Sequence, residues 1–287
     1  MIDRSPFIHI DVDRTEPAAL DVYFLGCVDF DAAQFLQQTF ADELAYRGDR
    51  HGKLLICEHP PLISIGREGG HANLGYSDAW LTEDHDDSNG PPSLDVRWVK
   101  RGGGAIVHAP GQLAIYPILP LELRSCGLLE YREKLQRAVM LACRDFRIGA
   151  ETRDDIPGIF TKYGQVGFVG LSVSRGISRQ GIFLNVSSPL DLHRAVKWST
   201  MKVDHADHVV DLVACDDLGD DVTIEISQTY SANPRSANIE QSRRVAIPSL
   251  RERIMHHVQH ELGYERSHLY TSHPLLRRVR RTKHVYA

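Results

Sequence analysis

The order of strand-like and helix-like segments constrains the fold of this chain more than any other feature of its sequence. Short apolar segments that end at glycine or proline are typical of strands, and apolar residues spaced three or four apart are typical of helices. The strands occur singly or as a hairpin, without regular alternation with helices. This order predicts an α+β fold, in which helices pack on a mixed β-sheet. The strand-like segments are residues 21–27, 54–57, 96–100, 113–118, 159–161, 166–173 and 182–186, and helices begin near residues 31, 128 and 249.

Length and composition predict a globular domain with additions at both ends. The chain has 287 residues, of which 42% are hydrophobic and 25% charged, the values of an ordinary globular protein. We expect an N-terminal extension at residues 1–20, a domain at 21–265 and a basic C-terminal tail at 266–287. An acidic run and a long polar stretch predict insertions in the domain near residues 83–95 and 216–242.

Charge and cysteine content exclude several classes of function. The net charge is -5 and the isoelectric point is about 6.3, so no global positive field attracts nucleic acid. Basic residues at 277–283 are interpreted as a solvated end rather than a polyanion-binding tail. Five scattered cysteines without a CxxC pair favour reduced thiols, and no stretch approaches the roughly 20 apolar residues of a membrane span. We therefore expect a cytoplasmic protein with neither a nucleic-acid nor a membrane partner.

The densest signal for function is a glycine-rich string that follows the predicted strand at 96–100. Consecutive glycines let a ligand approach bare backbone, and their turns expose N–H groups that can hold a carbonyl oxygen or an oxyanion. Arg101 and His108 flank the glycines as further donors. The string therefore predicts a substrate-binding turn. It reads Arg101-Gly102-Gly103-Gly104-Ala105-Ile106-Val107-His108-Ala109-Pro110-Gly111-Gln112-Leu113, and Tyr116-Pro117 follow shortly after.

This string resembles the signature of the octanoyltransferases of protein lipoylation, RGG-x-x-T-Y-H-G-P-G-Q-L followed by YP. Ile106, Val107 and Ala109 replace the threonine, tyrosine and glycine of that signature. The resemblance spans residues 21–212, because four further segments agree in order. They are residues 25–30, similar to the first strand and its exit; 58–61 with Gly66-Arg67, similar to EHPP…GR; 157–160, similar to PGV-aromatic; and 181–186, similar to the end of HG-x-A-L-N-V.

The resemblance implies a fold and a reaction. The fold is the α+β catalytic domain shared with lipoate and biotin protein ligases. The reaction moves an octanoyl group from acyl carrier protein to a lysine of a lipoyl domain, through a cysteine thioester and without a cofactor. Such chemistry needs a thiolate nucleophile and a lysine with a depressed pKa that takes and returns the proton. The acyl- or substrate-binding residues that the resemblance implies are Arg101, Gly102, Gly103, Gly104, His108, Gln180 and Gly181.

Three ungapped counts place other residues where the family keeps its reactive side chains. The lysine position, eight residues after Pro157, holds Gln165. The cysteine position, ten residues after Asp191, holds Met201, and the histidine of HG-x-A-L-N-V is replaced by Gln180. A glutamine amide does not titrate near neutral pH, and a methionine thioether has no proton to lose. The family mechanism is therefore not expected to run in this chain.

Lys162, Lys202 and Cys215 are the residues that could substitute for the missing base or nucleophile. Each would have to lie within hydrogen-bond reach of a partner for such a pair to work. Lys162 is predicted in a turn and is expected to face solvent. Buried, unreactive thiols are expected at Cys27, Cys57 and Cys143.

A metal site is the second possibility for the polar residues. The segment Asp204-His205-Ala206-Asp207-His208 could ligate a metal if it were helical. His256, His257 and His260 lie on a predicted helix that has its own apolar face. A polar loop is the favoured interpretation of residues 204–208, and no metal site is expected.

Three functions are compatible with these residues. The chain could be an octanoyltransferase with an unorthodox set of reactive residues. It could be a catalytically silent relative that binds a medium-chain acyl group, acyl carrier protein or a lipoyl domain. It could also be a lipoate-type ligase, which works through an acyl-adenylate and needs no cysteine. The ligase ranks lowest, because that superfamily also relies on a lysine in the strand that holds Gln165.

Overall fold

The computed structural model describes residues 18–69, 94–154, 156–189, 192, 212 and 245–276. Its helices are α1 (Phe30–Arg47), the short 3-10 helix η2 (Glu122–Arg124), α3 (Leu128–Asp145) and α6 (Ile247–Glu261). Its strands are β1 (Ala19–Cys27), β2 (Gly52–Glu58), β3 (Leu62–Ile65), β4 (Asp95–Trp98), β5 (Ala105–His108), β6 (Gln112–Ile118), β7 (Gly158–Thr161), β8 (Gly164–Ser174), β9 (Ile177–Asn185) and β10 (Arg266–Tyr270).

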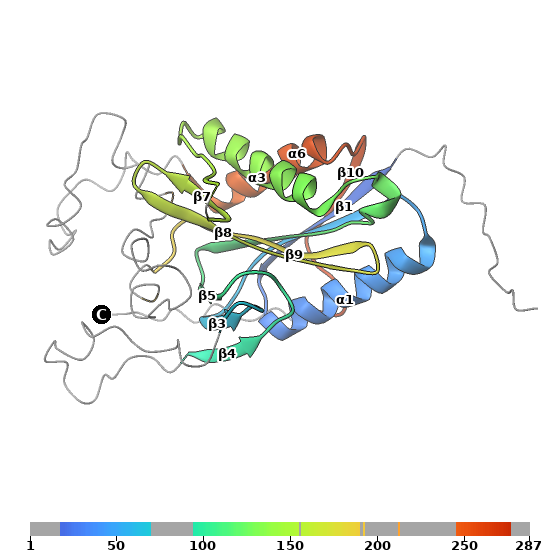
Figure 1. The fold of residues 1–287 in the computed structure, drawn as a ribbon, viewed down its shortest axis with the longest axis horizontal. Coiled ribbons are helices and arrows are strands. Elements are labelled where there is room, and N and C mark those ends of the chain that lie inside the picture. The colour runs from blue at the N-terminus through green and yellow to red at the C-terminus, as the bar shows by residue number, and fades with distance from the viewer. Residues whose placement is uncertain are drawn as a thin grey trace, which may run out of the picture.

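The described strands form two sheets, and helices cover both faces of the larger one (Figure 1). The larger sheet has seven strands in the order β10-β1-β2-β6-β9-β8-β7, and the smaller has three in the order β4-β3-β5. The pairs of β1 with β10, β1 with β2 and β3 with β4 are parallel, and the other pairs are antiparallel. Helices α3 and α6 lie on one face, and α1 lies on the other beside the smaller sheet (Figure 1). The predicted α+β class with a mixed sheet is confirmed.

Three strands differ from the prediction. β3 and β5 lie within the proline-rich and glycine-rich strings, which the sequence presented only as strand ends and turns. β10 occupies the start of the predicted basic tail, so the tail boundary at residue 266 was wrong. The physical reason is that β10 is a largely exposed edge strand without an apolar face to give a pattern. Of the predicted insertions, 83–93 and 216–242 lie outside the described residues.

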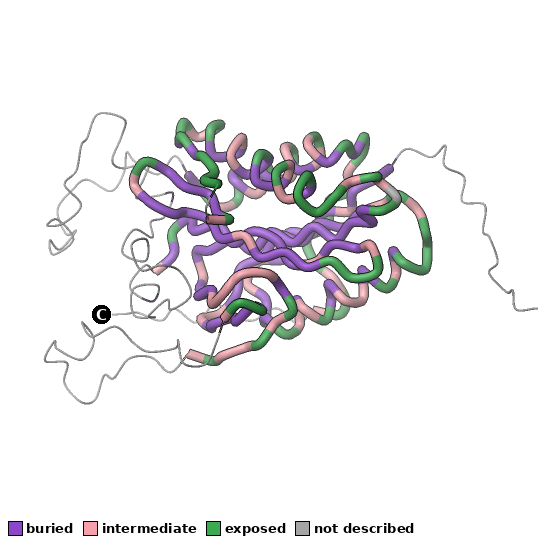
Figure 2. Tube along the Cα trace, viewed as in Figure 1, coloured by how far each residue is buried: buried purple, intermediate pink, exposed green. Residues whose placement is uncertain are grey.

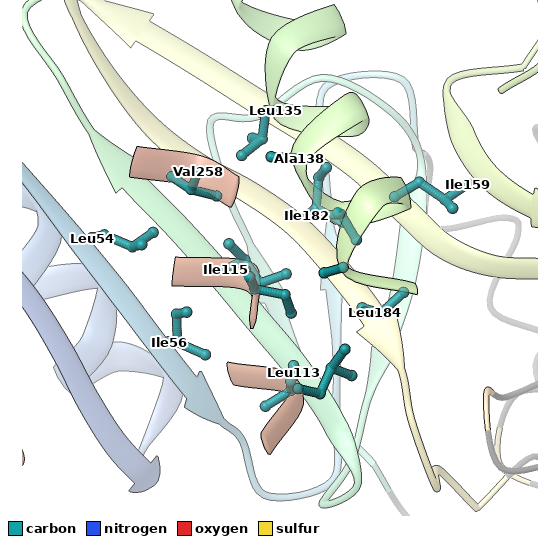
Figure 3. Close-up of a cluster of buried hydrophobic side chains, with 14 of the residues drawn as sticks. Leu54, Ile56, Leu113, Ile115, Leu135, Ala138, Ile159, Ile182, Leu184 and Val258 are labelled. Atoms are coloured by element: carbon teal, nitrogen blue, oxygen red, sulfur yellow. The ribbon is translucent and has the colours of Figure 1, made fainter. Parts of the chain in front are cut away.

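Apolar side chains fill both sides of the larger sheet, whose central strands are buried along their length (Figure 2). On the α3 and α6 side, Ile56, Ile115 and Ile182 come from three neighbouring strands and meet helix residues such as Leu135 and Val258 (Figure 3). On the α1 side, residues of α1 and the alternate positions of the same strands form a second cluster. Because both faces are covered, these strands have nearly continuous apolar sequences.

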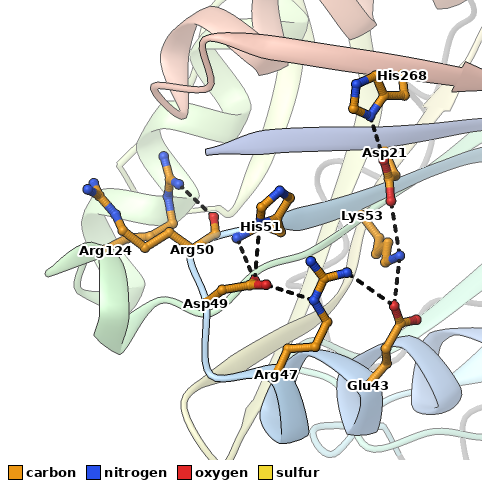
Figure 4. Close-up of polar contacts among 9 residues, drawn as sticks. All are labelled: Asp21, Glu43, Arg47, Asp49, Arg50, His51, Lys53, Arg124 and His268. Carbon is orange, nitrogen blue, oxygen red and sulfur yellow. Dashed lines mark hydrogen bonds and ion pairs between the residues drawn. The ribbon is translucent and has the colours of Figure 1, made fainter. Parts of the chain in front are cut away.

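A chain of ion pairs joins β1, β2 and β10 to α1 (Figure 4). Asp21 lies opposite both Lys53 and His268 in the parallel ladders. The Asp21 carboxylate lies 3.0 Å from the Lys53 Nζ and 3.1 Å from the His268 Nδ1. The Lys53 Nζ also lies 3.2 Å from the Glu43 Oε1. Lys53 is buried, so its two carboxylate partners supply the compensation that a buried ammonium requires.

Helix α1 begins at an aspartate cap, and this cap gives a stability prediction. The Asp29 Oδ1 accepts the N–H of Ala32 at 2.9 Å, which satisfies one of the unpaired donors of the first turn. We expect Asp29→Ala to lower the free energy of unfolding by about 1 kcal/mol, whereas Asp29→Ser should retain most of it. Urea denaturation followed by circular dichroism measures both variants. Equal losses in the two variants would contradict a capping role.

Candidate functional site

The glycine turn is held by the side chain that precedes it. The Arg101 Nη2 donates to the backbone oxygen and to the Oγ of Ser64, each at 2.8 Å, and the Nη1 donates to Gly102 O at 2.9 Å. Arg101 is fully buried, and this burial lowers its pKa to about 10, so it remains a cation at neutral pH. A Cβ on Gly170 of β8 would lie 2.6 Å from the Arg101 Cδ, so only glycine leaves room for this side chain. Arg101 thus fastens the turn between the two sheets.

The backbone N–H groups of the turn are partly used inside the fold. Gly102 N donates to Leu171 O of β8 at 2.9 Å, and Gly103 N donates to the Glu68 Oε1 at 3.1 Å. Gly103 has φ +78°, a left-handed conformation that glycine adopts at low cost. Two of the donors that the sequence offered for a substrate oxygen therefore already have protein partners.

His108 is the centre of a buried chain of hydrogen bonds. Its Nδ1 lies 3.0 Å from Gln112 Oε1, and its Nε2 lies 2.7 Å from Ser64 Oγ. The Gln112 Nε2 donates to Val107 O at 3.0 Å and to Asn185 Oδ1 at 2.9 Å, which leaves its Oε1 as an acceptor. The proton of neutral His108 is therefore on Nδ1, and Nε2 accepts from the Ser64 hydroxyl. Every polar atom of this imidazole is bonded within the protein.

A second buried histidine lies beside the first. The His59 Nδ1 donates to Val28 O at 2.8 Å, and its Nε2 accepts from the Tyr116 hydroxyl at 2.8 Å. Burial lowers the pKa of His59 to about 4, so the ring is neutral at pH 7. The Cys57 Sγ lies 3.7 Å from the same Nε2, but burial raises the pKa of this thiol. The pair is therefore no thiolate–imidazolium nucleophile.

Aromatic rings occupy the space next to these histidines. Phe183 is fully buried, with its ring centroid 4.7 Å from that of His108 and 5.7 Å from that of Tyr116. Phe168, opposite Phe183 in the β8–β9 ladder, belongs to the same cluster. In the string similar to HG-x-A-L-N-V, Phe183 stands at the alanine. A benzyl side chain therefore fills space that a methyl group leaves open.

Gln165 lies on β8, where it pairs with Phe160 of β7. Its side chain is buried, and its Nε2 donates to Gly167 O at 3.1 Å. A Cβ on Gly158 would lie 2.6 Å from this Nε2, so the amide packs directly against β7. The amide is held by its own strand and has no titrating proton.

The residues considered as substitutes are dispersed or not described. Lys162 is exposed in the β7–β8 turn, with its Nζ 5.0 Å from the Tyr163 ring centroid. The buried-thiol prediction is confirmed for Cys57 and Cys143, whereas Cys27 is only partly buried. Met201, Lys202, Cys215 and the segment 204–208 lie outside the described residues.

Gln180 and Gly181 lie where β9 approaches α1. Gln180 has φ +61°, its N–H donates to the Gln37 Oε1 at 2.8 Å, and its Nε2 donates to the Gln34 Oε1. A Cβ on Gly181 would lie 1.8 Å from Ile115 O of β6, so no larger residue fits this position. The structure thus brings Gln180 into a cluster of amides that no pattern in the sequence indicates.

A cavity of about 360 Å³ opens beside these amides, between α1, the end of β4 and the β8–β9 hairpin. Polar and charged side chains line much of it, among them Gln34, Gln37, Arg97, Lys100, Arg179 and Gln180. Arg101 and His108 do not line it. Of the predicted site residues, Gln180 lines this cavity, whereas Gly181 and the residues of the glycine turn do not.

Metal binding finds no support among the described residues, where no three His, Cys, Asp or Glu side chains gather as a metal site would require. On α6, the His257 Nε2 lies 2.8 Å from Asp145 Oδ2, and the rings of His256 and His257 are 5.3 Å apart. None of the described helices is long and apolar enough to cross a membrane.

Comparison with known proteins gives a consistent result. Residues 31–216 match the model of the lipoyl protein ligase A/B catalytic domain. An octanoyltransferase of Geotalea uraniireducens is 32% identical over 171 residues, which cover 60% of this chain and 72% of the relative. One from Desulfovibrio desulfuricans is 32% identical over 174 residues, with 60% and 68% covered.

Solved structures share the fold at lower identity. A lipoate protein ligase from T. acidophilum with bound lipoic acid has a TM-score of 0.55 at 16% identity, with 89% of this chain and 90% of that chain covered. A lipoate-protein ligase A bound with ATP has a TM-score of 0.54 at 14% identity, with the same coverage.

Proposed function

This chain belongs to the lipoyl protein ligase A/B catalytic-domain family, among the octanoyltransferases, and we propose that it is a catalytically silent member that binds the protein partners of that reaction. Those partners are octanoyl-acyl carrier protein and lipoyl domains. The observation that carries the proposal is the buried amide of Gln165, which occupies the position of the family's lysine and donates to Gly167 O.

The substitutions remove both halves of a proton-coupled acyl transfer. A thioester intermediate needs a thiolate, and the thioether of Met201 cannot form one. The leaving and entering groups need a base that titrates near neutral pH, and an amide does not. Among the described cysteines, Cys57 and Cys143 are buried, and both lie in apolar clusters of the fold. Burial of this kind favours the unreactive thiol.

The scaffold around the turn supports a retained binding role. Arg101, Ser64 and His108 form a continuous hydrogen-bonded series that fixes the glycine turn between the sheets. Phe183 takes up apolar space beside it, which favours recognition of the carrier protein over deep insertion of a free acyl chain. We also propose a cytoplasmic location, where isolated thiols such as those of this chain stay reduced.

An acyl-transfer assay tests the proposal that the chain is catalytically silent. Octanoyl-acyl carrier protein and a lipoyl domain are incubated with the chain, and the modified domain is detected by mass spectrometry. We expect product at the uncatalysed rate only, because general acid–base catalysis alone contributes about 10²–10⁴-fold and its base is missing. A parallel reaction with an active octanoyltransferase is the control. Product above background that disappears in Cys215→Ala or Lys162→Met would instead establish an unorthodox enzyme.

A binding titration tests the proposal that the chain binds the protein partners of the reaction. Octanoyl-acyl carrier protein, the unacylated carrier and a lipoyl domain are each titrated by calorimetry. Saturable binding of at least one of them supports the proposal, and no binding of any of them rejects it. ATP-dependent release of pyrophosphate in the presence of octanoate would replace it with a ligase function.

A further inference from the structure

The chain turns back onto the domain directly after β10, and a proline sets this turn. The N–H of Leu276 donates to His273 O at 3.0 Å, which closes a turn of four residues around Pro274 and Leu275. Pro274 stands at the second position of the turn, which its fixed φ suits. Leu276 packs against the apolar cluster on the α1 side of the sheet. Residues 271–276 thus form a clasp against the domain.

The ring of His273 attaches the clasp to two aromatic side chains. Its centroid lies 5.3 Å from that of Phe40 on α1, with the planes at 87°, and 5.7 Å from that of Tyr23 on β1, at 68°. Both contacts are edge-to-face, an arrangement that aromatic pairs favour. Tyr270 stacks on the same Tyr23 at 4.9 Å, so the clasp continues the aromatic contact that β10 begins.

These contacts suit the neutral imidazole. The His273 Nδ1 accepts the N–H of Leu275 at 3.3 Å, so the proton of the neutral ring is on Nε2. A second proton has to bind at Nδ1, and it would remove the acceptor of this hydrogen bond. The Lys53 Nζ already lies 5.1 Å from the centroid of the Phe40 ring, so an imidazolium at the same ring would meet a like charge.

The charged neighbours of His273 do not compensate an imidazolium. In the part of the chain that the structure describes, no carboxylate forms an ion pair with this ring. The nearest carboxylates, those of Asp21 and Glu43, are both engaged by Lys53 (Figure 4). His268 also contacts Asp21, so a proton on His268 would strengthen that contact and hold β10 more firmly.

The pH dependence of the clasp has a definite sign. Burial and the Lys53 ammonium lower the pKa of His273 below its ordinary value of 6.5, and Glu43 opposes them in part. When the clasp leaves the domain, the hydrated imidazole recovers its ordinary pKa. Between the two values the released state binds more protons, so release becomes more favourable as the pH falls below 6.5. The neighbouring phenols of Tyr23 and Tyr270 carry no charge in this range.

We propose that His273 is an acid-sensitive latch, which holds residues 271–276 on the domain when it is neutral and releases them when it takes up a proton. One proton moves from solvent to Nδ1, and the hydrogen bond from the N–H of Leu275 breaks. Release uncovers the rings of Tyr23 and Phe40, whereas β10 stays paired with β1. The latch needs none of the acyl partners, so it stands without the proposed function.

Hydrogen exchange of the full chain at pH 7.5 and 5.5, followed by mass spectrometry, tests the latch. For peptides that cover residues 271–276, the rate is compared with that of an unstructured chain at the same pH, which removes the intrinsic effect of pH. We expect the protection of these peptides to fall at least about fivefold at the lower pH, the effect of losing one hydrogen bond. A peptide from β6 is the internal reference and should keep its protection.

Variants at one position separate the charge from the ring. His273→Phe keeps an aromatic ring and takes up no proton, so its protection should be equal at the two pH values. His273→Arg carries a permanent cation, and its clasp should be released at both. His260→Gln, at an exposed position of α6, is the matched control and should respond to pH as the parent does.

Three results would overturn the proposal. The first is a parent chain whose clasp keeps its protection at pH 5.5. The second is a loss of protection in His273→Phe as large as in the parent, which would assign the pH response to another group. The third is an equal loss in the β6 peptide, which would mean that the whole domain opens rather than the clasp.

Discussion

Replacing Gln165 with lysine is expected to destabilise the protein by about 4 kcal/mol at pH 7, and this loss should shrink as the pH rises. The position is 3% exposed, so an ammonium there is separated from water. Desolvation disfavours the charged form and lowers the lysine pKa in the folded state, to about 7 against about 10.4 in the unfolded chain. Between these two values the unfolded state binds more protons, so the stability of the variant rises with pH.

Urea denaturation of Gln165→Lys and of the parent at several pH values between 6 and 10 measures this difference. Gln165→Met, which has similar length and no charge, is the matched control and should give a difference that is independent of pH. If the loss of unfolding free energy in Gln165→Lys were also independent of pH, the lysine side chain would be hydrated in the folded state, and the prediction would be wrong. The result bears on the proposed function, because the resemblance to octanoyltransferases implies a lysine with a depressed pKa at this position.

Replacing Gly181 with alanine is expected to lower the free energy of unfolding by about 4 kcal/mol or more. A Cβ at this position would lie 1.8 Å from the backbone oxygen of Ile115, and a backbone atom in a central strand cannot move aside as a flexible side chain can. β6 and β9 would have to separate at the centre of the larger sheet, where their ladder pairs Ile115 with Ile182.

Gly149→Ala is the control for Gly181→Ala. Gly149 is exposed, and a Cβ there meets no heavy atom within 4 Å. Thermal unfolding followed by circular dichroism should therefore show little change for Gly149→Ala and a large loss, or no folded protein, for Gly181→Ala. Similar melting temperatures for the two variants would mean that the sheet can open at β6–β9 without penalty.

The elements with strong periodicity were predictable from the sequence. α1 and α3 place apolar residues three and four positions apart, and both occur where that spacing indicated. The β7–β8 hairpin was also predicted, because Gly164 marks its turn between two apolar segments. β3 and β5 were missed because prolines precede the first and glycines precede the second, and both residue types indicate turns. β10 was missed because it is largely exposed and has no alternating apolar face.

The sequence located the glycine turn but not its geometry, and the binding role expected of its residues stays a prediction. The glycine string marked the turn and identified Arg101 and His108, yet it could not show that both are buried and bonded to Ser64. The hydrogen bond between Ser64 and His108 joins residues 44 positions apart in the sequence, and no local spacing encodes it. The amides of Gln34 and Gln37 lie on the buried side of a helix whose other residues are ordinary, so only the three-dimensional arrangement reveals their cluster with Gln180.

The parallel pairing of β1 with β10 has a consequence for synthesis of the chain on the ribosome. Asp21 and His268 form a contact across 247 residues, so β1 emerges long before its partner β10. At about 5–20 residues per second, this interval is roughly 10–50 s. Throughout it, the outer edge of β1 presents unpaired N–H and C=O groups to any neighbouring nascent strand. Emergence of Arg266–Tyr270 thus completes the seven-stranded sheet, and a chain that stopped before Arg266 would keep this edge of β1 unpaired.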